Sequence, residues 1–272
     1  MPTHITRLTP ARLVRLIVPA LLLGVALLLA LPAQPAAASC GGTTTVGTET
    51  ELNTAIAAFN AAGSPCVFTI QLSGDIALTK STNVIGNADS VSLVINGGGF
   101  AVDGQGTAGG QPFEIGIATV TMNDLTITGG RATGPAGTKS AVGGGIFNAG
   151  NLTLNNSVVT GNTALEEGGG IFNTVTTTPP GNLTLNNSVI SQNAAVLRGG
   201  GIFNRDGATA TVNNSTISGN TTTGGSQQGG SGVANRGAMT IANSTISGNT
   251  GGDFGGGVAN INGVMTIDNS TG

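Results

Sequence analysis

The chain has 272 residues, of which 47 are glycine and only 8% are charged, and it contains no tryptophan and no tyrosine. This composition is typical neither of an ordinary globular enzyme nor of a disordered polar tract, and it favours a repetitive β architecture. Because the glycines recur along the chain instead of gathering in one linker, we expect one elongated body.

The first 38 residues have the pattern of a signal peptide. Three arginines precede an apolar run at 17–31, and three alanines at 36–38 supply the small residues that cleavage requires. The run contains Pro19 and is shorter than the ~20 residues of a membrane-spanning helix. We therefore predict an exported protein, secreted or displayed at the cell surface, with a membrane anchor through this segment as the alternative.

Two cysteines, Cys40 and Cys66, flank a predicted helix. Outside the cytoplasm, such a pair is most simply a disulfide that ties the helix down. Residues 37–40 loosely match a lipoprotein box, so lipidation of Cys40 is the alternative. Two cysteines without histidine do not favour a metal site, and we expect neither a metal nor a cofactor.

The mature chain contains no histidine, because His4 is the only one and lies in the leader. A Ser-His-Asp triad and a histidine-based zinc site are therefore excluded. Without the leader, six basic residues face twelve acidic ones, a net charge of −6 that disfavours nucleic acid and anionic membranes as partners. We expect a monomer that meets the membrane only through the export segment or an anchor.

Residues 39–63 are predicted to form a capping helix segment. Thr48 and Glu51 have capping-box spacing, and Gly63 can end the helix. Its apolar residues recur on one face: Leu52, Ile56 and Phe59. The first coil of a β-solenoid exposes unpaired backbone groups and apolar side chains, so we expect this helix to cover that end.

From residue 64 to residue 272 the chain is predicted to be a β-helix. GGGIFN occurs at 143–148, 168–173 and 199–204, and its variants end at Asn235 and Asn260. Each copy is followed by a segment such as LTLNNS and then by a short strand that ends in TGN, SQN or SGN. One unit thus has three short strands and the length of one coil of a three-sided parallel β-helix, and we count about eight coils.

Alternation along the strands predicts which side chains point inward. The inward set is Leu152, Leu154, Leu183, Leu185, Val212, Met239, Ile241, Met265 and Ile267, with Ile146, Ile171, Ile202, Val233, Val258, Val159, Ile190, Ile217 and Ile246 from the other walls.

Asparagines recur at three corners of the repeat. The three columns are Asn148, Asn173, Asn204, Asn235 and Asn260; Asn156, Asn187, Asn214, Asn243 and Asn269; and Asn162, Asn193, Asn220 and Asn249. Asparagine tolerates turn conformations, and its amide can bond the same group one coil away. We assign these columns a structural role in satisfying buried corner polarity.

These units resemble the repeats of right-handed parallel β-helix proteins of the pectate-lyase-like superfold. They are most similar to the Gly-Gly-x-Ile and Phe-x-x-Asn style repeats of polymorphic outer-membrane proteins and related bacterial surface proteins. The resemblance covers about 113–272 and is weaker over 64–112. Because such proteins usually continue into further coils and a C-terminal anchor, we expect this chain to be truncated at its C-terminus.

A catalytic site is not predicted. Enzymes of this superfold use clustered aspartates together with a basic residue or histidine, whereas the aspartates here are scattered singly and the one adjacent acidic pair is Glu166-Glu167. Charged residues before the Gly-rich strand are instead interpreted as a ladder between coils: Lys139, Glu166 or Glu167, Arg198 and Asp253. A polysaccharide lyase or glycoside hydrolase remains the alternative function.

A candidate binding stripe is formed by Phe147, Phe172 and Phe203, which alternation sends outward. The alternative, which we favour, is that loops at 131–142, 174–181 and 221–230 cover it.

A third function is ice or crystal-surface binding by an outward threonine column, although the neighbouring column is mostly asparagine. The threonine column consists of Thr121, Thr153, Thr184, Thr211, Thr240 and Thr266. The favoured reading is an adhesin-like, binding or envelope structural module whose partner is a glycan or other cell-surface ligand.

Overall fold

The computed structural model describes residues 41–63, 65–87, 91–176, 180–224, 229–253 and 255–272, all within one compact unit, Pro35–Gly272. The predicted signal peptide and Cys40 lie outside the described residues, so export and the Cys40–Cys66 disulfide stay predictions. No helix in the described ranges is long and apolar enough to cross a membrane.

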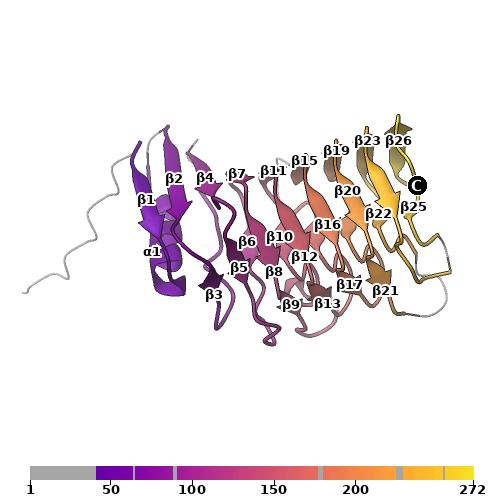
Figure 1. Ribbon diagram of the computed structural model, residues 1–272, viewed down its shortest axis with the longest axis horizontal. Coiled ribbons are helices and arrows are strands. Elements are labelled where there is room, and N and C mark those ends of the chain that lie inside the picture. The colour runs from indigo at the N-terminus through magenta and orange to yellow at the C-terminus, as the bar shows by residue number, and fades with distance from the viewer. Residues whose placement is uncertain (1–40, 64, 88–90, 177–179, 225–228, 254) are drawn as a thin grey trace, which may run out of the picture. The chain divides into compact units, whose positions relative to one another are not determined.

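The described chain winds into about eight coils of a parallel β-helix, in which the strands of successive coils stack side by side (Figure 1). Every strand pairing is parallel, which confirms the predicted fold class, a right-handed parallel β-helix with a helix ahead of the coils. The cross-section differs in one respect from the three-sided prediction. Four of the coils add a short fourth strand, so four sheets line the solenoid, and we name them A to D.

The strands have the following bounds. Sheet A consists of β1 (Thr43–Val46), β2 (Val67–Leu72), β4 (Ser92–Asn96), β7 (Thr119–Asn123), β11 (Asn151–Asn155), β15 (Asn182–Asn186), β19 (Thr209–Asn213), β23 (Ala238–Ala242) and β26 (Val264–Asp268). Sheet B consists of β3 (Ile76–Ala77), β5 (Ala101–Asp103), β8 (Thr126–Thr128), β12 (Val158–Thr160), β16 (Val189–Ser191), β20 (Thr216–Ser218) and β24 (Thr245–Ser247). Sheet C consists of β6 (Phe113–Ile115), β10 (Ile146–Asn148), β14 (Ile171–Asn173), β18 (Ile202–Asn204), β22 (Val233–Asn235) and β25 (Val258–Asn260). Sheet D consists of β9 (Arg131–Ala132), β13 (Thr163–Ala164), β17 (Ala194–Ala195) and β21 (Thr221–Thr222).

Identical positions of the repeat stack on one another, since Ile146 pairs with Ile171 and Ile171 with Ile202. The strands of sheet A alternate between buried and partly exposed residues, as the period-two pattern predicts. The predicted inward side chains form the main core, with Val258 and Met265 partly buried. Ile267 is the exception at 50% exposure, because β26 is the outermost described strand of sheet A.

Two asparagine columns are hydrogen-bonded from coil to coil inside the corners. In the column from Asn148 to Asn260, each amide nitrogen donates to the next amide oxygen at 2.7 to 2.8 Å. In the column from Asn162 to Asn249, the corresponding distances are 2.9 to 3.0 Å. In the coils that carry these columns, the chain therefore turns at the same place with its buried amides paired.

The second predicted column differs from the expectation, because its asparagines are exposed instead of buried. They are the turn residues, with φ values of 48 to 51°: Asn156, Asn187, Asn214, Asn243 and Asn269. This left-handed backbone turns their side chains to solvent, although Asn269 still donates to Asn243. The continuous amide column lies one residue earlier, at Asn96, Asn123, Asn155, Asn186 and Asn213.

A column of serines completes this corner, and sequence reasoning missed it. Each serine hydroxyl accepts the backbone N–H of the serine one coil earlier at 3.0 to 3.2 Å: Ser188, Ser215, Ser244 and Ser270. The serine that ends every N-N-S, A-N-S or D-N-S segment is the signal that could have found it.

The glycine triplets are required by close approach between coils. A Cβ at Gly169 would collide with the carbonyl oxygens of Ala194 and Gly200. Both atoms belong to backbone and cannot rotate away, so the coil-to-coil spacing depends on glycine here.

Helix α1 (Glu49–Asn60) covers the N-terminal end of the core, beside β1 and β2 (Figure 1). Thr48 accepts a hydrogen bond from the Glu51 N–H, as the predicted capping box requires, whereas the Glu51 carboxylate accepts one at 2.8 Å from the N–H of Gly47, one residue before the N-cap. Its apolar face is buried in the main core, where Phe59 meets Phe68 edge to face. The preceding residues differ from a purely helical segment, because β1 adds a strand to sheet A.

Candidate functional site

Sheet C is the wall that is covered on both faces. All three residues of β10, β14, β18 and β22 are buried, whereas the strands of sheets A and B keep an outward, partly exposed set. Its outer face carries a second apolar cluster, separate from the main core: Val142, Phe147, Ala149, Phe172, Phe203 and Ala234, with Ile261 packed against them.

Phe147, Phe172 and Phe203 form a stacked row on this outer face. The ring centroids of Phe147 and Phe172 are 5.6 Å apart, and those of Phe172 and Phe203 are 5.5 Å apart. The three residues are only 6%, 2% and 1% exposed, so the prediction of an exposed stripe is wrong. The rings cover one another's faces, and Val142 from the loop at 131–142 packs onto them, as the covering-loop alternative expects.

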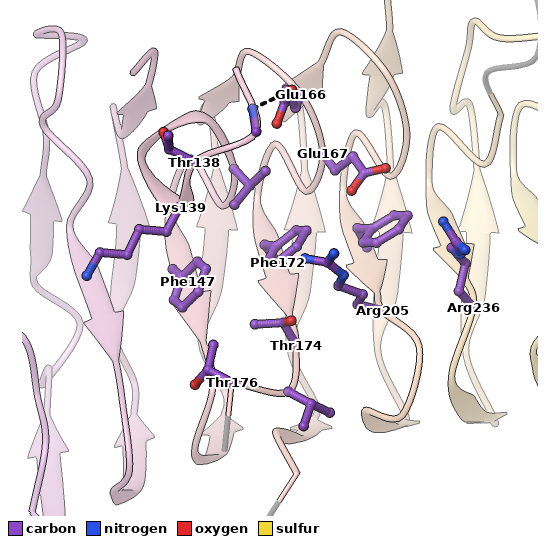
Figure 2. Close-up of a pocket in the computed structure, with 14 residues that line it drawn as sticks. Thr138, Lys139, Phe147, Glu166, Glu167, Phe172, Thr174, Thr176, Arg205 and Arg236 are labelled. Atoms are coloured by element: carbon purple, nitrogen blue, oxygen red, sulfur yellow. Dashed lines mark hydrogen bonds between the residues drawn. The ribbon is translucent and has the colours of Figure 1, made fainter. Parts of the chain in front are cut away.

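A pocket of about 380 Å³ lies over the phenylalanine row, and we call it the sheet C pocket (Figure 2). This volume is within the range of small-molecule sites. Residues from four successive coils, those of β10, β14, β18 and β22, line the pocket. Its charged lining consists of Lys139, Glu166, Glu167, Arg205 and Arg236, and threonine hydroxyls come from Thr138, Thr174 and Thr176.

Two of the lining charges are anchored on the N-terminal side of the pocket. Lys139 forms an ion pair with Glu114, which occupies the position of the phenylalanine row one coil before Phe147. The Glu166 carboxylate accepts a hydrogen bond from the Gly137 N–H at 2.9 Å, drawn as a dashed line in Figure 2. The predicted ladder pairing of Lys139 with Glu166 or Glu167 is therefore replaced by pairing with Glu114.

Two further lining charges have partners in neighbouring coils. Glu167 pairs with Arg198 at 2.8 Å, as the charge-ladder interpretation expects for adjacent coils. Arg236 binds the Asp206 carboxylate through two contacts, at 2.9 and 3.1 Å. Asp253, the last predicted member of the ladder, is exposed and outside the pocket lining.

Arg205 differs from the other four charged lining residues. Throughout the described ranges, its exposed guanidinium has no hydrogen bond or ion pair. Its backbone is fixed, because the Arg205 N–H donates to the Asn173 carbonyl at 2.9 Å. Figure 2 shows the side chain extending towards Phe172 at the floor of the pocket.

Burial raises the pKa of the Glu167 carboxyl above its ordinary value. The hydrogen bond and the charge of Arg198 act against this shift, as does the charge of Arg205, whereas the neighbouring Glu166 carboxylate adds to it. Glu166 and Glu167 are thus adjacent in sequence and both line the pocket, but they have different partners.

The threonine column lies on the outer face of sheet A in continuous register: Thr121, Thr153, Thr184, Thr211, Thr240 and Thr266. One neighbouring column is the internally bonded asparagine column that includes Asn155 and Asn186. A second threonine column is absent beside it over the described strands, so the paired array that ice binding favours is not formed.

Metal ligands do not gather anywhere in the described ranges, where no group of three or more histidine, cysteine, aspartate or glutamate side chains is found. Comparison of the chain with protein-family models and with curated protein sequences finds no match. The parallel β-helix fold itself is compatible with surface, binding and enzymatic roles.

Proposed function

We propose that this chain is an exported, adhesin-like β-helix module that binds a saccharide in the sheet C pocket. The observation that carries the proposal is the pocket itself, which joins a covered aromatic floor, threonine hydroxyls and an unpaired guanidinium on one wall of the solenoid. An envelope role that is only structural requires none of these features.

The pocket is preorganised. Its floor is a hydrogen-bonded sheet flanked by a buried asparagine column, and four of its five charged side chains are oriented by partners or by backbone. A rigid site loses little conformational entropy when a ligand enters, which favours affinity.

The lining also matches the chemistry of sugars. A sugar hydroxyl both donates and accepts hydrogen bonds, and the pocket offers carboxylate acceptors at Glu166 and donors at Arg205 and Arg236. The signal-peptide pattern supports a place where such ligands are met, at the cell surface or outside the cell.

The test is a glycan-array screen of the mature protein, residues 39–272, run beside lyase and hydrolase assays on acidic and neutral polysaccharides. We expect binding to a restricted set of glycans without turnover. If the protein bound none of the glycans on the array, the proposal would be contradicted.

A second candidate function is glycoside hydrolysis, and the raised pKa of Glu167 is the observation that favours it. Glycosidases pair a carboxylic acid of raised pKa with a carboxylate, and Glu166 and Glu167 both line the pocket. The ion pair with Arg198 supports a structural role for Glu167 instead. Turnover in the assays above would make the enzyme the better account.

A further inference from the structure

We propose that Arg205 makes the sheet C pocket selective for an anionic saccharide, one that carries a carboxylate or a sulfate ester. This inference rests on the proposed binding function and adds the chemical class of the ligand. It follows from how the charges of the pocket are compensated.

Four of the five lining charges already have a partner. Lys139, Glu167 and Arg236 form ion pairs with residues outside the lining, and Glu166 accepts a backbone N–H. Arg205 alone among the charged lining residues has no such contact, although its charge reaches Glu167. Arg205 is therefore the one cation of the lining without an anionic partner, just as Glu166 is the one anion of the lining without a cationic partner.

The position of Arg205 favours a ligand contact. It directly follows Asn204, and Arg236 follows Asn235 at the same place in the next coil, where the Arg236 N–H donates to the Asn204 carbonyl at 2.8 Å. The backbones of the two arginines thus lie in adjacent coils, about 4.8 Å apart, which is the usual spacing of paired strands. Asp206 neutralises Arg236, whereas Arg205 has no such partner and is left to bind an incoming anion.

The guanidinium group suits this role better than an ammonium group does. It is planar, and its parallel N–H groups bind a carboxylate or sulfate through two hydrogen bonds. The adjacent buried phenylalanine row displaces water from one side of the site, and reduced solvation strengthens such a pair.

Isothermal titration calorimetry of the mature protein with three matched probes tests the inference. The probes are a linear hexuronate oligosaccharide, its carboxyl-reduced neutral counterpart, and that neutral oligosaccharide after sulfation. We expect wild type to bind one of the acidic probes at least about tenfold more tightly than the neutral one, the effect of one charge-assisted contact. The acidic probe that binds more tightly identifies carboxylate or sulfate as the recognised group.

Three variants assign the preference to the residue. Arg205→Gln is expected to bind the acidic probes only as tightly as the neutral one, and Arg205→Lys to keep a reduced preference. Arg131→Gln removes the same charge from an exposed side chain outside the pocket lining and is expected to keep the full preference. Unchanged thermal midpoints in all three would show that the fold is intact.

The failure of this inference differs from failure of the proposed function. Equal affinity of wild type for acidic and neutral probes would overturn the anionic selectivity and leave saccharide binding in place. A preference that survives in Arg205→Gln would remove Arg205 from the site. Failure of wild type to bind any probe or any glycan on the array would overturn both proposals.

Discussion

Replacement of Asn193 by alanine is expected to lower the free energy of unfolding by about 3 to 4 kcal/mol, because it leaves several buried polar groups without partners. The Asn193 amide nitrogen donates to Asn220 at 3.0 Å and to the Val159 carbonyl at 2.9 Å. Its amide oxygen accepts two hydrogen bonds from Asn162, one from backbone and one from side chain, both at 3.0 Å. Alanine satisfies none of these groups, and the corner is fully buried.

Urea unfolding followed by circular dichroism measures this loss. The matched control is Asn187→Gly, an asparagine of a neighbouring turn that is exposed and has a φ of 51°. Glycine adopts this backbone freely, so we expect a change within about 0.5 kcal/mol. Equal effects of the two substitutions would show that the buried column contributes no more than the exposed turn.

Replacement of Phe172 by alanine is expected to cost about 3 to 5 kcal/mol, the usual range for a buried phenylalanine. The ring is stacked between Phe147 and Phe203, so its removal breaks both contacts and leaves a cavity in the second apolar cluster. Because this cluster is the floor of the sheet C pocket, we also expect weaker ligand binding.

Differential scanning calorimetry compares this variant with Phe100→Ala. Phe100 is 36% exposed and lies outside the second cluster, so its loss is expected to cost about 1 kcal/mol or less. If Phe172→Ala were as mild as Phe100→Ala, the phenylalanine row would not be a sealed cluster.

The fold could be predicted because each position of the repeat packs against the same position in the next coil. Once GGGIFN of one coil stacks on GGGIFN of the next, Ile146 meets Ile171 and Asn148 meets Asn173, and alternation fixes which face each occupies. Such information is local in sequence, and it extends to every coil that keeps the pattern.

Features that depend on the backbone of one residue were predicted less well. Asn155 and Asn156 are chemically identical neighbours, yet only Asn156 adopts a positive φ and turns to solvent. The choice between them depends on the serine that follows, whose side chain must enter the corner to accept a backbone N–H. Sequence periodicity alone predicts that asparagines stack at this corner, but it does not tell which of the two adjacent asparagines forms the hydrogen-bonded column.

The sheet C pocket could not be predicted because its walls lie outside the repeat. Val142 and Lys139 belong to the insertion at 131–142, which is longer than the corresponding segments before β14 and β18, and Glu114 lies in a coil whose sequence has diverged. Whether the phenylalanines are covered, and whether Arg205 has a partner, depends on these irregular segments. The outward direction of the phenylalanines was predictable, but their burial was not.

Affinity measurements with a pocket-filling variant test most directly whether the sheet C pocket binds the ligand. Thr176 is exposed and lines the pocket, whereas Thr245 is exposed on β24 of sheet B. Isothermal titration calorimetry of wild type, Thr176→Trp and Thr245→Trp with the tightest glycan from the array compares the two positions. We predict that Thr176→Trp lowers the affinity at least about tenfold, or 1.4 kcal/mol, and that Thr245→Trp leaves it unchanged. Equal affinities of all three proteins would contradict binding in this pocket.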